Sequence, residues 1–351
     1  MIEIDGSFGE GGGQVLRTSV ALAAVLQKEI RVFNIRAGRA EPGMRPQHMT
    51  GVKAAAQLCS AETKGFEVGS TELVFRPGEI RSGHFAFDVG TAGSITLVLQ
   101  TLMPILAFTP GKVTLEITGG TDVKWSPTID YVGFVVVPLL RTIGYSVVLQ
   151  TLKRGYYPKG GGLARLTTLG VHTLGPMARR SRGTILPIAG ISHSRLLPGH
   201  VAARQAIGAI KKVTDAKLPR TDLGLDNMEN QTSLSPGSGI LVYAKTTNDQ
   251  VLGADSVGER GLQAEKVGEK AGQTLVEEIA SEAVLDRHMA DIVIPYLILA
   301  EGISDVTISR LTQHTLTNAK VAEWLTGKKV EIEGELDKPG RLRMTGINLA
   351  T

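Results

Sequence analysis

The same order of predicted elements recurs along the chain, and this repetition is the strongest constraint on its fold. In the first copy, "IEIDGSFGEGGGQVLRTSVALAAVL", a short strand leads through a glycine-rich turn into an apolar helix. The stretch "FAFDVGTAGSITLVLQTLMPIL" repeats this order, with Asp5 and Asp88 at matching positions. A β-branched strand, a polar loop and a second helix follow in each copy. We therefore predict an α/β (α+β) fold built from repeated βαβ-type units.

A third copy is interrupted. "DRHMADIVIPYLILAE" supplies its first helix, "VTISRLTQHT" its strand and loop, and "NAKVAEWLTG" its second helix. The segment between copies two and three has a different pattern of apolar and polar residues and is typical of a small inserted α/β domain. We predict a large three-repeat domain made of residues 1–181 and 280–351, and an inserted domain of residues 182–279. With 351 residues, the chain is also too long for one ordinary core.

Composition narrows the class of protein. The net charge is only +4, so any nucleic-acid binding is expected to be local rather than spread over a basic coat. A single cysteine and an N-terminus unlike a signal peptide favour a reducing, cytoplasmic setting. The most apolar runs, residues 131–140 and 292–300, are about half the roughly 20 residues that a membrane span needs. They indicate buried core helices and no membrane association.

The glycine-rich stretch "FGEGGGQVLRTS" precedes a predicted helix. Glycines in that position let backbone amides approach a phosphate, and the helix end adds positive potential. Gln14 stands where the dinucleotide pattern has glycine, so a tight turn with close helix packing explains the stretch equally well. Nearby, Arg17 is suited to a phosphate and Glu10 to a metal ion, although surface charge is the ordinary explanation for both.

The loop "IRAGRAEPGMRPQHMT" is rich in cations and holds one acid, Glu41. It concentrates Arg36, Arg39, Arg45, Gln47 and His48. Such a loop resembles a phosphate-binding patch, and a solvated charged face is the competing interpretation.

Two further segments carry polar groups in apolar surroundings. Gln100 lies in a predicted helix among leucines and valines, which suits either recognition of a base or ribose or an interior hydrogen bond. Asp286, His288 and Asp291 gather at a predicted helix start, where acids are favoured for ordinary electrostatic reasons.

His314 lies between a predicted strand and a helix expected to begin near Thr317 or Asn318. The positive end of that helix would disfavour the imidazolium form and attract an anionic phosphate. A neutral imidazole nitrogen is a competent nucleophile at phosphorus. A single histidine in a loop more often has no catalytic role.

Six motifs in order give a more specific indication. "DGSFGEGGGQVLR", "IRAGRAEPG", "GTAGSITLVLQT", "GGTD", "YPKGGG" and "LTQHTLTNAKV" resemble the RNA 3′-terminal phosphate cyclase family of archaea and bacteria over essentially the whole chain. The resemblance implies three repeats with four-stranded sheets, each similar to the C-terminal domain of translation initiation factor three, and a small α/β domain inserted in the last repeat.

The resemblance also implies a chemistry. Family members use ATP to convert an RNA 3′-phosphate into a 2′,3′-cyclic phosphodiester, a ligase-class reaction that passes through a histidine–AMP adduct and an RNA-pp-A intermediate. The nucleophile of the family's "HTxTN" motif falls on His314. Divalent Mg²⁺ or Mn²⁺ is expected, with Glu10 as its candidate ligand.

The same comparison assigns roles by motif position. Residues expected to bind ATP are Gln100, His288, Met289, Ala290, Asp291 and Ile292. Residues expected at the phosphates or the metal are Glu10, Arg17, Arg36, Arg39 and Gln47. The role of Arg45 is less secure, because some relatives carry an apolar residue there.

Two other classes stay open. A non-catalytic, cyclase-like factor in ribosome assembly would be expected to lack the nucleophilic histidine, and an enolpyruvyl transferase would need carboxylate sites in place of the adenylylation motif. A homo-oligomer is compatible with the sequence, which does not specify its order.

Overall fold

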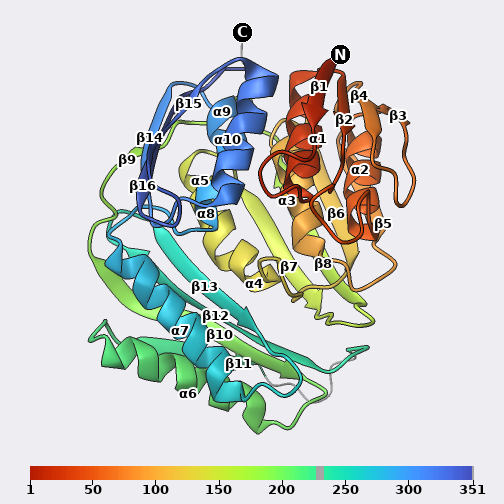
Figure 1. Cartoon of the computed structure of the whole chain (residues 1–351). Helices are drawn as coiled ribbons and strands as arrows, with labels where there is room; N and C mark the ends of the chain where they lie inside the picture. Colours follow the sequence, from red (N-terminus) through yellow and green to blue (C-terminus); the bar gives the residue numbers. More distant parts are fainter. Residues whose placement is uncertain (227–232, 350–351) are drawn as a thin grey trace.

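Sheets of four strands form the framework of the protein (Figure 1). A computed structural model of the chain describes residues 1–226 and 233–349. Within these residues four such sheets occur, three from the repeats and one from the inserted segment.

The first repeat has the order βαβαββ. Its elements are β1 (Ile2–Asp5), α1 (Gln14–Leu26), β2 (Ile30–Phe33), α2 (Pro46–Leu58), β3 (Glu62–Lys64) and β4 (Leu73–Arg76). The strands lie in the order β1-β2-β4-β3. β1 and β2 are parallel, and the other two pairs are antiparallel. A parallel pair needs a crossover connection, and α1 provides it.

The second repeat has the same topology. It comprises β5 (Gly83–Asp88), α3 (Ile95–Leu106), β6 (Lys112–Gly119), a composite helix, β7 (Val147–Lys153) and β8 (Gly162–Leu169). The composite helix consists of α4 (Ile129–Tyr131), the π-helical turn η1 (Val132–Val136) and α5 (Val137–Thr142). The strand order β5-β6-β8-β7 matches that of the first repeat.

The third repeat is assembled from both sides of the insertion. Its first strand, β9 (Ala178–Arg179), pairs in parallel with β14 (Ile303–Ile308). The remaining elements are α8 (Met289–Ile292), α9 (Ile294–Leu299), α10 (Gln313–Thr326), β15 (Val330–Gly334) and β16 (Gly340–Thr345). The predicted architecture of three α/β repeats is therefore confirmed.

One element of the third repeat differs from the prediction. The first helix was expected to be continuous, whereas it is divided into α8 and α9. Pro295 stands at the start of α9. Because proline has no amide hydrogen, it interrupts the helical hydrogen-bond ladder at this point.

The inserted segment has its own sheet and its own apolar cluster. It contains β10 (Ile185–Arg195), α6 (His200–Asp215), β11 (Thr221–Asp226), β12 (Gly237–Thr246), β13 (Val251–Val257) and α7 (Ala264–Ala280). The strand order is β11-β10-β12-β13, and α6 and α7 pack on the sheet around residues such as Val242 and Leu275. These features support the predicted boundaries at residues 182 and 279, which stay a prediction.

β11 includes the start of the polar stretch "LGLDNMENQTSLSPGSG". The first four residues of this stretch belong to the strand. They pair in parallel with β10, with Leu223 opposite Gly190. Residues 227–232 of the same stretch lie outside the described residues.

The helices of the three repeats face one another. Eleven of the 13 residues of α1 are buried, and ten of the 12 residues of α3. α1 contacts both α3 and α10. Figure 1 shows these helices between the sheet of the first repeat and that of the third, with the inserted segment below. The helix starts of different repeats are thereby brought together.

The apolar runs 131–140 and 292–300 are helical and largely buried within this helical layer. Among the residues that the structure describes, none of the helices has both the length and the apolar character to cross a membrane.

We expect Leu102→Ala, on α3, to lower the free energy of unfolding by about 2–5 kcal/mol, because Leu102 is fully buried in the main core. Leu152→Ala is the matched control: its side chain lies on β7 and is 43% exposed. Its effect should stay within about 0.5 kcal/mol. Chemical denaturation of both variants checks this, and equal losses would contradict the assigned core.

Candidate active site

His314 lies in the first turn of α10. The sequence had suggested a loop at this position. The helix begins at Gln313, about one turn earlier than expected. Thr312 is its N-cap, and the Thr312 hydroxyl oxygen accepts a hydrogen bond from the Thr315 amide at 3.1 Å. The cap explains the early start, because threonine satisfies one of the amides that a helix leaves unpaired at its beginning.

The imidazole of His314 is half-buried and has two different edges. Its Nε2 lies 3.4 Å from Glu10 Oε2. Its Nδ1 is shielded from solvent and has no hydrogen-bond partner among the described residues. Burial lowers the pKa of His314; Glu10 opposes this shift, and the cation Arg17 adds to it. The ring is therefore neutral at pH 7, as expected for a nucleophile.

Asn318, one turn further along α10, fixes the helix against its neighbours. Its Oδ1 accepts hydrogen bonds from Thr18 Oγ1 at 2.6 Å and from Gln14 Nε2 at 3.0 Å. Its Nδ2 donates to the backbone oxygen of Asp291 at 2.8 Å. One buried carboxamide thus joins α1 of the first repeat to α8 and α10 of the third.

The glycines of "FGEGGGQ" are required by close approach. Gly9 has φ +67°, and a Cβ there would lie 2.4 Å from Thr317 Oγ1. A Cβ on Gly13 would lie 2.2 Å from His48 Nε2. The packing explanation therefore holds for both positions, and it brings the turn against the start of α10.

Two arginines border this turn. The Arg39 guanidinium lies 3.5 Å from Glu10 Oε2. Arg17 donates to Gln14 Oε1, while its Nε is shielded and without a partner in the described part of the chain. Burial lowers the pKa of Arg17 to about 10, although Asp291 opposes the shift. The positive charge here is poorly compensated, as expected at a site for anions.

His48 lies among the same cations. Burial lowers its pKa to about 3, and Arg17, Arg36 and Arg45 add to the shift. His48 Nδ1 accepts a hydrogen bond from the Arg45 amide at 3.1 Å. The imidazole of His48 is therefore neutral, and it packs among Arg17, Arg36 and Arg45 without adding a further positive charge.

The other residues of the basic loop have partners of their own. Arg36 donates to the backbone oxygens of Glu41 at 2.7 Å and Gly43 at 2.8 Å, which stabilises the loop. Arg45 forms an ion pair with Glu41. Gln47 Oε1 accepts from the Ser94 amide at 3.1 Å, which links α2 to the start of α3.

A pocket opens where the three repeats meet. Its walls include Gln100 from α3, Val132 and Val136 from η1, Ile292 from α8, and Arg17 from α1. Asn318 also lines it. The structure therefore brings Gln100, Ile292 and Arg17 together, beside the helix that carries His314.

The segment 288–292 is held by Asp286. Asp286 Oδ1 accepts hydrogen bonds from the amides of His288 at 3.0 Å and Met289 at 2.9 Å. Met289 and Ala290 are fully buried in the main core, and the amides of both donate hydrogen bonds to Asp286. Burial raises the pKa of the Asp291 carboxyl to about 7, against the opposing effect of His288 and Arg17.

Comparison with known proteins identifies the family. The sequence profile of the RNA 3′-terminal phosphate cyclase family matches residues 8–332. This chain belongs to that family. The proteins called RNA 3′-terminal phosphate cyclase from Ignicoccus hospitalis and Hyperthermus butylicus are 48% and 49% identical to it, over 99% of this chain and 99% and 98% of their own length. The protein of that name from Pyrobaculum aerophilum is 44% identical over 97% of this chain and 96% of its own.

The sequence did not predict the contacts of several buried residues in this protein. The hydrogen bonds of Asn318 cross from the third repeat to the first, and the burial of His48 depends on how α2 packs against the glycine turn, which the local sequence pattern does not show. A buried group of Asp122, Asp130, Arg154 and His193 was also missed. Its one visible signal was Asp122 in "GGTD", a motif noted for its glycines.

We expect Asn318→Ala to lower the free energy of unfolding by about 2–3 kcal/mol, because it strands buried partners on α1 and α8, each at a cost of about 1–3 kcal/mol. Lys320→Ala, on an exposed part of the same helix, should change it by less than about 0.5 kcal/mol. Denaturant titration of the two variants compares them; a loss as small for Asn318→Ala would refute its role as a joint.

Proposed function

We propose that this protein converts the 3′-terminal phosphate of an RNA into a 2′,3′-cyclic phosphodiester at the expense of ATP. One observation carries the proposal: a neutral, half-exposed histidine at a helix start lies in the field of Arg17 and Arg39 in a member of the cyclase family. The relatives from Ignicoccus hospitalis and Hyperthermus butylicus carry the name RNA 3′-terminal phosphate cyclase.

In the first step, His314 Nε2 attacks the α-phosphorus of ATP. A nitrogen–phosphorus bond forms, the bond to the β-phosphate oxygen breaks, and pyrophosphate leaves. Because Nδ1 is shielded from solvent, Nε2 is the nitrogen that a nucleotide can approach. Covalent catalysis of this kind divides one difficult displacement into easier steps.

In the second step, an oxygen of the RNA 3′-phosphate attacks the phosphorus of the histidine-bound AMP and restores the free imidazole. The product is an RNA-pp-A anhydride. In the third step, the neighbouring 2′-hydroxyl attacks the RNA phosphate, loses its proton, and expels AMP. A phosphate monoester lacks a good leaving group, and joining it to AMP supplies one.

Positive groups around His314 suit the charge that builds up in these steps. The Arg17 guanidinium and that of Arg39 border the glycine turn, and the first amides of α10 point out of its N-terminus. Phosphoryl transfer depends mainly on positioning and on neutralising such charge.

Arg36 and Gln47 have a different place in the proposal. Both already hold backbone groups, Arg36 within its loop and Gln47 at the start of α3. We assign them to shaping the phosphate site, with direct contacts left to Arg17 and Arg39.

The nucleoside of ATP is assigned to the walls of the pocket between the repeats, whose free space of about 20 Å³ has to widen to admit it. Gln100 offers a carboxamide to the base or ribose, and Ile292, Val132 and Val136 offer apolar contact. His288 and Asp291 lie next to this wall, and the fully buried Met289 and Ala290 are assigned to packing beneath it.

Glu10 is the residue that would hold Mg²⁺ or Mn²⁺. Its carboxylate is one-third exposed and lies between His314 and Arg39, so its oxygens face the place where phosphates are expected. Oxygen ligands of this kind suit both ions, which supply charge neutralisation at a triphosphate.

A non-catalytic role in ribosome assembly is the alternative. It accounts for the family fold but leaves the neutral, half-exposed His314 without a purpose. The presence of the complete "HTLTN" sequence, His314 to Asn318, favours the catalytic role.

We expect the protein to form an acid-labile adduct when incubated with ATP labelled at the α-phosphate, and His314→Ala to abolish it. His84→Ala is the control, since His84 is an exposed histidine on β5. The adduct should be chased by RNA ending in a 3′-phosphate and not by the same RNA ending in a 3′-hydroxyl. A wild type without adduct, or an undiminished adduct in His314→Ala, rules out the mechanism.

The pH dependence of adenylylation gives a second test. Because burial lowers the pKa of His314, the rate should stay high below pH 6.5 and fall only when the ring becomes protonated at lower pH. Glu10 raises this pKa, so Glu10→Gln should move the fall to still lower pH. Arg39 lowers it, so Arg39→Gln should move the fall to higher pH. Rapid-quench rates across the pH range measure the midpoints, and shifts of the same sign would contradict the assigned electrostatics.

A further inference from the structure

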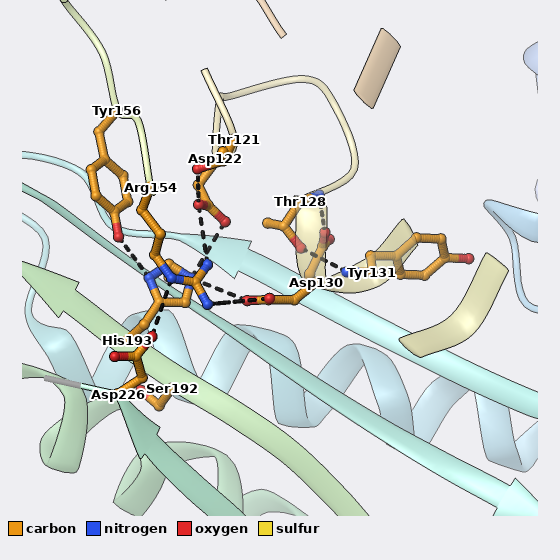
Figure 2. Close-up of polar contacts among 12 residues, drawn as sticks. Thr121, Asp122, Thr128, Asp130, Tyr131, Arg154, Tyr156, Ser192, His193 and Asp226 are labelled. Atoms are coloured by element: carbon orange, nitrogen blue, oxygen red, sulfur yellow. Dashed lines mark hydrogen bonds and ion pairs between the residues drawn. The ribbon is translucent and has the colours of Figure 1, made fainter. Parts of the chain in front are cut away.

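A buried polar cluster lies at the junction of the second repeat and the inserted segment (Figure 2). Asp122 follows β6, Asp130 belongs to α4, and Arg154 follows β7, all in the second repeat. His193 comes from β10 of the inserted segment. The cluster is separate from His314 and Glu10 and has no part in the function proposed above.

Three atoms of this cluster face one another. His193 Nε2 lies 3.3 Å from Asp122 Oδ1 and 3.6 Å from Asp130 Oδ2. All three side chains are at least nine-tenths buried, with side-chain exposures of 1%, 0% and 7%. None of the three atoms has a hydrogen bond of regular geometry within the described residues, although Asp130 Oδ2 lies 2.9 Å from the Arg154 guanidinium. Buried polar atoms without partners are costly, and three together indicate a group that binds among them.

The other atoms of the same side chains are held in place. His193 Nδ1 is hydrogen-bonded to the Tyr156 hydroxyl at 2.8 Å. Asp122 Oδ2 accepts from Thr121 Oγ1 at 2.6 Å and from Arg154 at 3.4 Å. Asp130 Oδ1 accepts from Arg154 at 3.2 Å. Metal ligands characteristically show this division, in which one atom binds the ion and the rest are fixed by outer partners.

We propose that Asp122, Asp130 and His193 bind a divalent transition-metal ion of the Zn²⁺ type, which fastens the inserted segment to the second repeat. The three ligand atoms lie within 4.8 Å of one another. Two ligands at about 2.0–2.1 Å from a tetrahedral ion are about 3.3 Å apart, close to the observed separations of His193 Nε2 from the carboxylates. One imidazole and two carboxylates form a mixed nitrogen and oxygen set that suits Zn²⁺ better than Mg²⁺.

Binding of a divalent ion would change the net charge of the cluster from −1 to +1. Asp122, Asp130 and Asp226 contribute three negative charges, against two from Arg154 and Arg195, so the cluster has an excess of one with His193 neutral. Arg154 also lies 2.9 Å from Asp130 Oδ2 without forming a hydrogen bond to it, so the ion would share that oxygen's charge with a guanidinium. The rival occupant is a proton on His193, which would neutralise the cluster.

Metal analysis of the full-length protein tests the proposal. Protein purified without chelator should contain about one zinc per chain, and the chelated protein should regain it with a rise in Tm on adding Zn²⁺. His193→Gln and Asp122→Asn should each weaken Zn²⁺ binding at least 100-fold, measured against a chromophoric chelator. Tyr156→Phe keeps the three ligands but removes an outer partner, so it should weaken binding about 10–100-fold.

Two control variants test whether zinc binds at a different place in the protein. His200→Gln removes an exposed histidine of the same inserted segment, and Glu10→Gln removes the candidate active-site ligand. Both should bind Zn²⁺ as the wild type does. The zinc measurement does not depend on cyclase activity. A failure of the metal site would therefore leave the proposed reaction untouched, and a failure of the proposed reaction would leave the metal site untouched.

If the ligand variants do not fold, the metal site can still be tested on the wild-type protein. Co²⁺ added to the chelated wild type should give the visible absorption of a tetrahedral site and be displaced by Zn²⁺. No bound zinc and no change of Tm with Zn²⁺, or binding unchanged in His193→Gln, would overturn the metal site. Stability that depends on pH but not on metal would assign the cluster to a protonated His193 instead.

Discussion

The fold depends on the burial of helices that are apolar nearly all round. α1 and α3 expose almost nothing, so one side of each must pack on its own sheet and the other on a helix of another repeat. Three sheets can satisfy this requirement only by turning their helices toward one another. The helix ends and the turns before them then meet near the middle. His314, the glycine turn and the pocket are all consequences of this arrangement.

Because the site is formed within a helical layer, its charges are poorly solvated. This shielding lowers the pKa of His314 and of Arg17 and raises that of Asp291 to about 7. Shielding also strengthens the attraction of each uncompensated cation for an anion. Glu10, Arg39 and His314 stay in contact with solvent, with side-chain exposures of 35%, 48% and 44%. The same burial that stabilises the fold thus prepares a neutral nucleophile beside an anion site.

Sequence reasoning succeeded where the signal is local or periodic. The three repeats were predictable from their recurring strand, turn and helix. Composition and motif singled out the basic loop and His314, whose roles stay a prediction. β9 was not, because two residues pair with a strand more than a hundred positions away. The start of α10 was misplaced because Thr312 competes as a cap with later threonines. Asp122, Asp130 and His193 meet only through packing of the inserted segment, so no spacing in the sequence marks them as a group.

The inserted segment is connected to the pocket by a chain of buried contacts. Asp286 Oδ2 accepts from the Gly253 amide of β13 at 2.9 Å, while its Oδ1 accepts from the Tyr131 hydroxyl at 2.6 Å and from the first amides of α8. β13 also approaches η1 closely, since a Cβ on Gly253 would lie 2.5 Å from a methyl of Val135. Both η1 and α8 contribute to the wall of the pocket. A shift of the inserted segment would therefore have to move that wall or break these hydrogen bonds. Through these contacts, the inserted sheet supports the positions of η1 in the second repeat and α8 in the third, and so the two walls of the pocket that they form.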